Sequence, residues 1–358
     1  MNTEDKKIAI LSITQNGKDL GLIIKNNIKK ADLFFIKRDI SIEKDSDKEN
    51  YVIYIKKRLK DFVSEIFDKY DYIIFIMATG IVIRTIAPLI VNKFSDPAIL
   101  VTDEKGRNVI SLLSGHMGGA NEMTLYISRL IDSNPVITTA TDVNEKSSLD
   151  MIAKKLNAYI DNFRDNVLKI NSMIVNNKKV GLYIDGDYKV DTRGFTVCKK
   201  DELNSYENIV AISNKKDIGF DKDNIIKVVP KNIVLGIGCK RNTDSEHMKN
   251  SLIEFLDKEN IHIKSIESIG SIELKKDEEA IINLCRFLEV PFKTFTVEEI
   301  SEVDYLYGKS EWVKQNVGVY SVAEPVAHLL SDGNLIIEKN TYKGITFSVG
   351  RIDIWYML

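Results

Sequence analysis

The stretch YIIFIMATGIVIR, residues 72–84, decides the fold class. Its first part, Tyr72–Met77, is a continuous apolar run, which is typical of a strand covered on both faces of a sheet. A turn of small residues follows, and the pattern of residues 81–90 predicts a helix that stops near Pro88. A buried strand joined by a short turn to a helix is the repeating unit of a parallel α/β sheet.

The same alternation continues on both sides of this stretch. Further strands are predicted at residues 7–13, 33–37, 98–102, 108–113 and 136–139. Helices are predicted at residues 20–30, 52–67 and 121–131. Strands that alternate with helices indicate a mostly parallel sheet with helices on both faces.

The pattern changes at Ser147. Two helices, 149–159 and 166–176, precede short strands at 179–184, 209–213 and 225–229. Beyond residue 231, strands are predicted at 232–237, 263–267 and 292–295, and helices at 245–256 and 278–288. A hairpin of 335–339 with 345–352 ends the chain. We therefore expect an α/β protein with three parts: residues 1–142, a small middle part at 143–230, and residues 231–358.

Composition excludes several classes of protein. The chain has 358 residues, with 50 basic and 52 acidic side chains and a formal net charge of −2. This balance argues against binding to nucleic acid or membrane through bulk charge. The polar first residues and the lack of an apolar run long enough to cross a bilayer predict a cytoplasmic protein. The three cysteines form no C-x-x-C pair, so neither a disulfide framework nor a cysteine zinc site is expected.

The segment SGHMGGAN, residues 114–121, lies between a predicted strand and a predicted helix. Its glycines allow the backbone to approach a ligand closely, and the helix start presents N–H groups that suit a carboxylate or phosphate. A tight connection that needs glycine for its dihedral angles is the alternative. His116 favours a site because an imidazole acts as acid or base near neutral pH. The candidate binding residues here are Ser114, Gly115, Gly118, Gly119 and Asn121.

Two other segments are predicted to line the same crevice. After the strand 72–77, Thr79 and Gly80 lie in the turn, and Arg84 is expected in the first turn of the helix, where it binds a carboxylate or is simply solvated. After residue 138, the candidates are Thr139, Thr141 and Asp142, which line the crevice or cap a helix that begins near Ser147.

The C-terminal part offers two weaker candidates. Residues 236–243, GIGCKRNT, place Gly238, Lys240 and Arg241 before a helix start, which favours an anionic ligand. Thr243 with Glu246, and Thr296 with Glu299, have the spacing of a capping box.

Residues 321–328, SVAEPVAH, place Pro325 at the expected first position of a helix. Glu324 and His328 are then one helical turn apart. They form an acid/base pair or, alternatively, Glu324 caps the helix and His328 is simply hydrogen-bonded. No cluster has metal-ligand spacing, so no metal held by the protein is predicted.

Taken together, these motifs resemble the cobalt-precorrin-5A hydrolase family of anaerobic cobalamin biosynthesis. The segments that carry the resemblance are GIVIRTIAPL (80–89), DP (96–97), LLSGHMGGAN (112–121), PVITTATD (135–142), GIGCKRNT (236–243) and SVAEPVA (321–327). They occur in the family's order and cover both ends of the chain.

The resemblance implies a hydrolase that acts on a carbon–carbon bond. Its substrate is a cobalt corrinoid whose ring-A δ-lactone is opened with water, after which acetaldehyde leaves and cobalt-precorrin-5B remains. The family's signature identifies the residues but not their mechanism. Our hypothesis makes His116 the general base, with Glu324 the alternative, and the N–H groups around Gly118 and Gly119 the oxyanion donors. No cofactor is expected, because cobalt comes with the substrate, whose macrocycle supplies the electron sink.

The substrate's acetate and propionate arms require local cations. Those expected are Arg84, Lys93, Lys240 and Arg241. A large flat macrocycle favours a cleft between the N- and C-terminal parts. Two rival functions are a non-catalytic corrinoid-binding protein and a sugar-phosphate or nucleotide enzyme that uses residues 115–119 as an anion cradle. A homodimer is expected from base rates, and transient hand-over of the corrinoid to neighbouring pathway enzymes is a further expectation.

Overall fold

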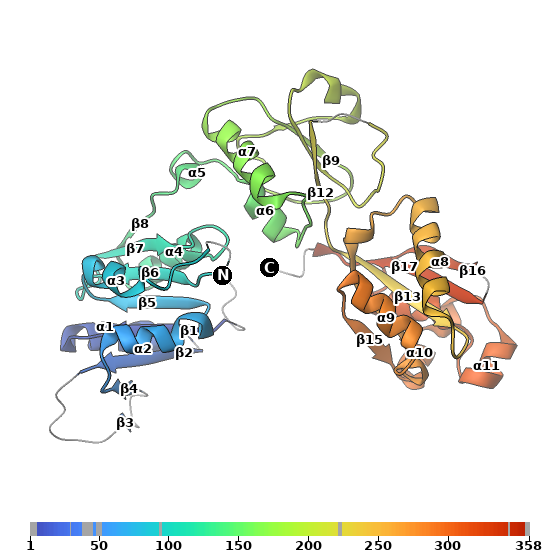
Figure 1. The fold of residues 1–358 in the computed structure, drawn as a ribbon, viewed down its shortest axis with the longest axis horizontal. Helices are drawn as coiled ribbons and strands as arrows, with labels where there is room; N and C mark the ends of the chain where they lie inside the picture. The colour runs from blue at the N-terminus through green and yellow to red at the C-terminus, as the bar shows by residue number, and fades with distance from the viewer. Residues whose placement is uncertain are drawn as a thin grey trace. The chain divides into compact units, whose positions relative to one another are not determined.

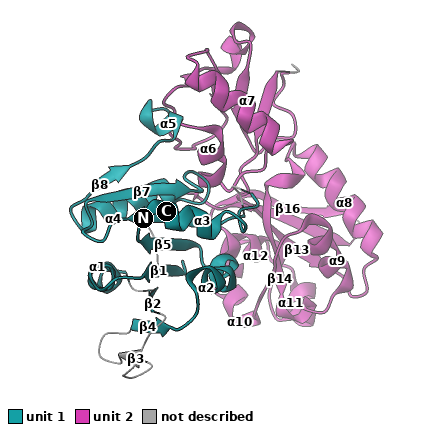
Figure 2. Ribbon diagram, turned by 60° about the vertical axis from the view of Figure 1, so that its left-hand side comes forward, with its two compact units in different colours: residues 1–146, 358 teal, residues 147–357 magenta. Residues whose placement is uncertain are grey.

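The computed structural model describes residues 6–28, 30–37, 46–47, 52–92, 95–220, 224–342 and 344–354. The chain forms two compact units, Met1–Lys146 (unit 1) and Ser147–Met357 (unit 2) (Figure 2). Over the described residues, unit 1 contains one sheet of eight strands and unit 2 contains two sheets, of four and five strands (Figure 1). The predicted α/β class with mostly parallel sheets is confirmed, and each sheet lies within one of the three predicted parts.

The sheet of unit 1 has the strand order β3-β4-β2-β1-β5-β6-β7-β8. Its strands are β1 (Ile8–Ser12), β2 (Ala31–Ile36), β3 (Ser46–Asp47), β4 (Val52–Ile55), β5 (Tyr72–Ile76), β6 (Ala98–Thr102), β7 (Asn108–Leu113) and β8 (Asn134–Val136). Strands β4, β2, β1, β5 and β6 are parallel. β7 is antiparallel to β6, and β8 is parallel to β7. β7 and β8 therefore end at the edge of the sheet where β5 and β6 begin.

Helices cover both faces of this sheet. They are α1 (Gln15–Asn26), α2 (Leu59–Ile66), α3 (Thr79–Ile86) and α4 (Ala120–Leu130), with a 3-10 turn η1 (Phe67–Lys69); the single turn α5 (Ala140–Val143) follows β8. Successive residues of β1 alternate between the faces: Ile10 packs with α1 and α4, and Leu11 packs with α2 and α3. The sheet is thus buried on both sides, as the apolar run in β5 predicts.

Three predicted elements of unit 1 are wrong in part. Residues 52–55, predicted as the start of a helix, are strand β4, because this apolar run pairs with β2 and the helix begins only at Leu59. The strand predicted at 136–139 ends at Val136, and Thr139 is instead the N-cap residue of α5. Helix α3 begins at Thr79, so Arg84 lies in its last turn rather than its first.

Unit 2 begins with the four-stranded sheet, order β10-β9-β11-β12, in which every pair is parallel. Its strands are β9 (Gly181–Ile184), β10 (Thr196–Val197), β11 (Ile209–Ile212) and β12 (Ile225–Val228). Helices α6 (Leu149–Lys155) and α7 (Phe163–Val175) pack on it, and a 3-10 helix, η2, spans Lys200–Ser205.

The five-stranded sheet has the order β15-β14-β13-β17-β16. Its strands are β13 (Ile233–Cys239), β14 (Ile266–Ile272), β15 (Phe292–Phe295), β16 (Leu335–Tyr342) and β17 (Ile345–Arg351). Its helices are α8 (Ser245–Lys258), α9 (Glu279–Leu288), α10 (Val297–Ser301), α11 (Glu311–Val317) and α12 (Ala323–Leu330), with 3-10 turns η3 (Ile263–Ser265), η4 (Glu273–Lys275) and η5 (Asp304–Leu306). β16 and β17 form the predicted terminal hairpin.

Glycines let α12 rest directly on this sheet. A Cβ at Gly236 would lie 1.9 Å from the carbonyl oxygen of Ala323, and a Cβ at Gly350 would lie 2.7 Å from that of Ala327. Helix α12 begins at Ala323, so the prediction that Pro325 is its first residue is wrong by two positions.

The two predicted capping boxes have different outcomes. Thr296 and Glu299 form the predicted box at α10. The box at α8 is wrong: Asp244 caps that helix by accepting the N–H of His247, while the hydroxyl of Thr243 donates to the Lys240 carbonyl. Across the described ranges, no helix combines the length and apolar character that a bilayer crossing requires.

Candidate active site

His116 lies in a tight loop that joins β7 to α4. Ser114 and Gly119 both have left-handed backbone conformations, with φ of 56° and 87°. A Cβ at Gly118 would lie 2.4 Å from the Ser114 Cβ, and a Cβ at Gly115 would lie 2.7 Å from Asn121 Oδ1. The glycines are therefore required by the turn itself, as the alternative interpretation holds, and this turn carries His116 at its centre.

The imidazole of His116 contacts two residues that follow β8. Its Nε2 lies 2.6 Å from Asp142 Oδ2 and 2.9 Å from Thr141 Oγ1. When Nε2 carries the proton that faces the carboxylate, the lone pair of the neutral ring is on Nδ1. A carboxylate that orients a histidine in this way is the arrangement that general-base catalysis uses.

Asn121, in the first turn of α4, connects the loop to the residues after β8. Its Nδ2 donates to Asp142 Oδ2 and to Thr139 Oγ1, both at 3.0 Å. Its Oδ1 accepts the hydroxyl of Ser111 at 2.6 Å. Because Asn121 is only 5 % exposed, this network is a fixed feature of the fold.

We refer to His116, Asn121, Thr139, Thr141 and Asp142 as the His116 cluster. The side chain of His116 is 19 % exposed and that of Asp142 is 40 % exposed, so the pair borders solvent above the buried Asn121. The prediction that the two segments meet is confirmed. The alternative, in which Asp142 caps the next helix, is wrong, because Ser148 is the N-cap residue of α6.

The N–H groups that were predicted to bind an oxyanion donate hydrogen bonds within the loop itself. The N–H of Gly119 donates to the carbonyl of His116 at 3.1 Å. The N–H groups of Ala120 and Asn121 donate to the carbonyls of Ser114 and Gly115 at 3.2 and 3.0 Å. The prediction that the Gly119 N–H donates to an oxyanion is therefore wrong. The left-handed turn places carbonyl groups of the loop against the N–H groups at the start of α4.

Thr79, Gly80 and Arg84 lie at the opposite edge of the sheet. Helix α3 follows the carboxyl end of β5, whereas a Cβ at Gly119 would lie 2.7 Å from the hydroxyl of Tyr72, the first residue of that strand. A five-residue strand separates the two edges by about 16 Å. The prediction that these residues share a crevice with His116 is wrong, because β7 runs antiparallel to β6.

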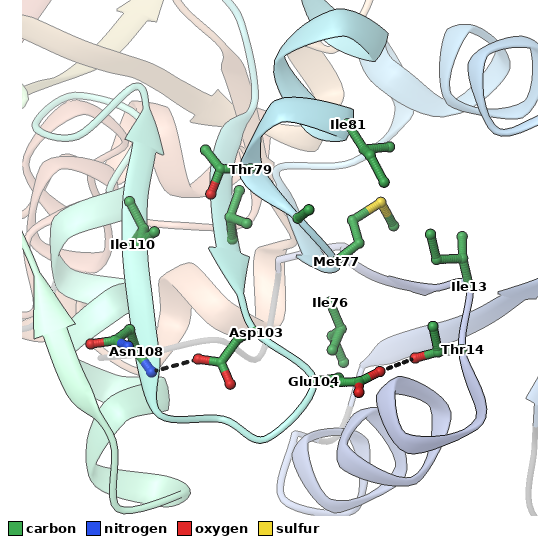
Figure 3. Close-up of a pocket in the computed structure, with 12 residues that line it drawn as sticks. Ile13, Thr14, Ile76, Met77, Thr79, Ile81, Asp103, Glu104, Asn108 and Ile110 are labelled. Atoms are coloured by element: carbon green, nitrogen blue, oxygen red, sulfur yellow. Dashed lines mark hydrogen bonds between the residues drawn. The ribbon is translucent and has the colours of Figure 1, made fainter.

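The edge at Thr79 has a pocket of its own, of about 470 Å³ (Figure 3). It lies where β1 and β5 end, the switch point at which ligands bind in many α/β sheets. Its acidic groups are internally bonded: Glu104 accepts the hydroxyl of Thr14 at 2.8 Å. Burial raises the pKa of Asp103, but backbone N–H groups, including that of Asn108, outweigh this effect and lower it. Such an acidic rim disfavours a ligand that carries carboxylates.

The predicted anion site in the C-terminal part holds one of the chain's own carboxylates. The N–H groups of Asn242 and Thr243 donate to Glu278, at 3.3 and 3.0 Å. Glu278 is nine-tenths buried, so an incoming anion would have to displace it. Gly238 is half-buried, and Lys240 and Arg241 are exposed on the loop before α8.

Glu324 and His328 bind different partners. Glu324 is 4 % exposed and accepts the hydroxyl of Ser321 at 3.2 Å and the N–H of Lys339 at 3.4 Å. His328 Nδ1 lies 2.7 Å from the hydroxyl of Tyr307. The interpretation of a hydrogen-bonded histidine is thus confirmed, but that of Glu324 as a capping residue is wrong, because Val322 is the N-cap residue of α12 and no side chain of the described residues caps this helix.

Sequence reasoning missed Ser111 and Glu278, since no local spacing connects either residue to its partner. Lys93 lies outside the described residues. Among the residues that the structure describes, no three His, Cys, Asp or Glu side chains gather as metal ligands.

Comparison with known proteins gives the family. The family model described as cobalamin synthesis G N-terminal matches residues 61–142, that of the cobalamin biosynthesis central region matches 147–224, and that of the cobalamin synthesis G C-terminus matches 233–350. The first match covers β5 to β8, which is half of the eight-stranded sheet, the second covers β9 to β11, and the third covers nearly all of the five-stranded sheet.

Relatives agree with these matches. A cobalt-precorrin-5A hydrolase of Salmonella typhimurium is 41 % identical over 290 residues, which cover 79 % of this chain and 83 % of that protein. One of Priestia megaterium is 26 % identical over 98 % of this chain and 96 % of its own. A crystal structure of a cobalamin biosynthesis protein G homologue from Sulfolobus solfataricus has 26 % identity and a TM-score of 0.41, with 97 % of each chain covered. The chain belongs to the cobalamin synthesis G family, the family of these cobalt-precorrin-5A hydrolases.

Proposed function

We propose that this chain hydrolyses cobalt-precorrin-5A in cobalamin biosynthesis, and that the His116 cluster performs the reaction. Water opens the ring-A δ-lactone, acetaldehyde leaves, and cobalt-precorrin-5B remains. The 41 % identity to a hydrolase of this substrate supports the reaction. The observation that carries the site assignment is the 2.6 Å contact between His116 Nε2 and Asp142 Oδ2 at the border of solvent.

His116 is the general base in this proposal. Asp142 accepts a hydrogen bond from the Nε2–H group and thereby orients the ring. Nδ1 then takes a proton from the attacking water. Asp142 also stabilises the imidazolium that forms. Asn121 fixes Asp142 Oδ2 from the buried side, at 3.0 Å, and is a positioning residue.

In the later steps His116 gives up the proton that it took from water. Collapse of the tetrahedral intermediate breaks the lactone C–O bond and frees a hydroxyl group on the two-carbon fragment. Loss of the hydroxyl proton turns its carbon into the aldehyde carbon, and the electron pair of the broken carbon–carbon bond goes to the macrocycle, which takes up a proton. The cobalt macrocycle acts as the electron sink, so these steps require only proton transfers from the protein.

The other predicted residues have narrower roles. Ser114, Gly115 and Gly118 shape the loop and are proposed to bind the substrate beside His116. Glu324 is buried and accepts hydrogen bonds from Ser321, which precedes α12, and from the Lys339 N–H in β16, so we assign it to the stability of unit 2 rather than to the chemistry. Binding roles for Gly238, Lys240 and Arg241 stay predictions, as do the cleft, the homodimer and the hand-over to pathway enzymes. Thr79, Gly80 and Arg84 follow β5 at the other edge of the sheet and take no part in this reaction.

The test of the reaction is anaerobic incubation of the purified chain with cobalt-precorrin-5A. We expect one acetaldehyde per corrinoid, measured by its reduction with NADH and alcohol dehydrogenase, and loss of the lactone in the mass spectrum. Binding of the corrinoid without release of acetaldehyde would contradict the proposal and would identify a binding protein instead.

A further inference from the structure

Unit 2 contains a groove of about 1070 Å³ between the edge of its four-stranded sheet and the region between α8 and η3. The side chains that matter for its chemistry are Tyr159, Lys216, Lys227, Asp257, His262 and Lys264. Its volume is at the upper limit for small-molecule sites, which suits a large ligand. The reaction proposed above does not use this groove.

Hydrogen bonds fix the two walls of the groove relative to each other. The N–H of Asp217 donates to Asn260 Oδ1 at 2.7 Å, and Asn260 Nδ2 donates back to the Asp217 carbonyl at 2.8 Å. The N–H of His262 donates to the carbonyl of Asn214 at 2.7 Å. Because each of these bonds has at least one backbone partner, the groove is preformed and binding need not order its walls.

An aromatic surface and lysines meet inside the groove. The rings of Tyr159 and His262 lie 6.2 Å apart at an angle of 31°, and Lys264 Nζ lies 5.7 Å from the centre of the Tyr159 ring. Burial lowers the pKa of His262, and the charges of Lys227, Lys264 and Lys216 lower it further. Three lysine side chains therefore act on this imidazole.

The acidic groups that line the groove already have partners. Asp257 binds Lys216 at 2.6 Å. Asp217 accepts the N–H of Gly219 at 2.6 Å, and Asp161 accepts the hydroxyl of Tyr159 at 3.3 Å. Three lysines and three aspartates line the groove, but the charges that act on His262 are those of the lysines.

We propose that this groove binds carboxylate arms of the cobalt corrinoid, with Lys264, Lys227 and His262 as the contacts and the Tyr159 ring as an apolar wall. The inference rests on the proposed function, because it takes the corrinoid as the ligand. It gives unit 2 a binding role of its own, away from the loop of Lys240 and Arg241.

The test uses dicyanocobyrinic acid, a stable cobalt corrinoid with free carboxylate arms, and dicyanocobinamide, whose arms are amides. Lys264→Glu and Lys227→Gln are each expected to weaken binding of the acid by about tenfold, since a charged hydrogen bond is lost. Binding of the cobinamide should change less than threefold. Lys276→Glu, an exposed lysine of unit 2 outside the groove lining, is the matched control and should leave both affinities unchanged.

A second measurement follows the four histidines by NMR, with His262→Gln to assign the signal. The acid should raise the pKa of His262, because a bound carboxylate offsets the lysine charges, whereas the cobinamide should not. Equal affinities of the lysine variants and the wild type for the acid, or an unmoved His262 pKa, would overturn the inference. Such a result together with normal acetaldehyde release would leave the proposed function intact, whereas no acetaldehyde release from the wild type would refute that function alone.

Discussion

The two edges of the unit 1 sheet carry similar sequence patterns but opposite chemistry. At one edge, β7 and β8 end in a glycine loop and in residues 139–142, which together make the His116 cluster. At the other edge, β1 and β5 end around a pocket with Asp103 and Glu104, whose carboxylates bind the chain itself (Figure 3). One edge joins a histidine to a carboxylate beside solvent, and the other presents an acidic rim.

The difference comes from a single reversal of strand direction. Strands β4, β2, β1, β5 and β6 are parallel, so their ligand-binding ends share the edge at Thr79. β7 turns back, and its end lies on the far side. A strand-turn-helix motif thus identifies a possible site, but only the direction of its strand says which edge carries that site.

The largest effect is expected from Asp142→Asn. The amide neither stabilises an imidazolium nor enforces the tautomer with its lone pair on Nδ1, so kcat for acetaldehyde release should fall about 100- to 1,000-fold. KM should change little, and Asp142→Glu should restore part of kcat, which a purely structural role would not predict. A kcat within threefold of the wild type would remove Asp142 from the reaction.

A pair of glycine substitutions compares the edges directly. Gly118→Ala places a Cβ 2.4 Å from the Ser114 Cβ and 2.7 Å from its carbonyl oxygen, so we expect a loss of about 2 kcal/mol in the free energy of unfolding. Gly80→Ala places its Cβ 3.5 Å from the Arg84 guanidinium, an ordinary contact, and should stabilise α3 by up to about 1 kcal/mol. Urea unfolding measures both, and equal effects would contradict the described loop.

Asn121→Ala tests the buried connection between the loop and Asp142. It leaves the hydroxyl of Ser111 and the oxygens of Thr139 and Asp142 without this partner, at a cost of about 1–2 kcal/mol in unfolding free energy. Asn134→Ala, which removes an exposed hydrogen bond, is the control and should cost below about 0.5 kcal/mol. Similar losses for the two variants would argue against a fixed network at Asn121.

The smallest effect concerns the acidic edge. The folded state lowers the pKa of Asp103, so its ionised form adds stability above the unfolded pKa, and this stability is lost as the pH falls through the folded value. Asp103→Asn should therefore destabilise the chain by less than about 1 kcal/mol at pH 7, and by less still below about pH 4. A difference between variant and wild type that grows on acidification would contradict this sign.

Local patterns were sufficient for much of this fold. The apolar run of β5 and the glycines around His116 predict a strand and a turn because each depends on neighbouring residues alone. The meeting of residues 114–121 with residues 139–142 was predicted correctly because β7 and β8 are parallel and adjacent, so their ends share an edge.

The errors concern contacts that the local sequence does not contain. The direction of β7 depends on its pairing with β6, and an apolar run such as Val52–Ile55 suits a buried helix or a strand until its partner is known. Glu278 reaches the N–H groups of Asn242 and Thr243 from another element, 36 and 35 residues along the chain, and so occupies a site that the loop's sequence offers to an anion.

The most direct measurement of the central claim is single-turnover release of acetaldehyde from cobalt-precorrin-5A by two variants, one for each edge of the sheet. His116→Gln removes the proposed base and should slow release at least about 100-fold. Thr79→Val changes the acidic pocket and should leave the rate within about twofold of the wild type, because Thr79 is half-buried at the edge of the sheet opposite to His116. Normal release by His116→Gln, or a loss confined to Thr79→Val, would place the reaction at the other edge and contradict this account.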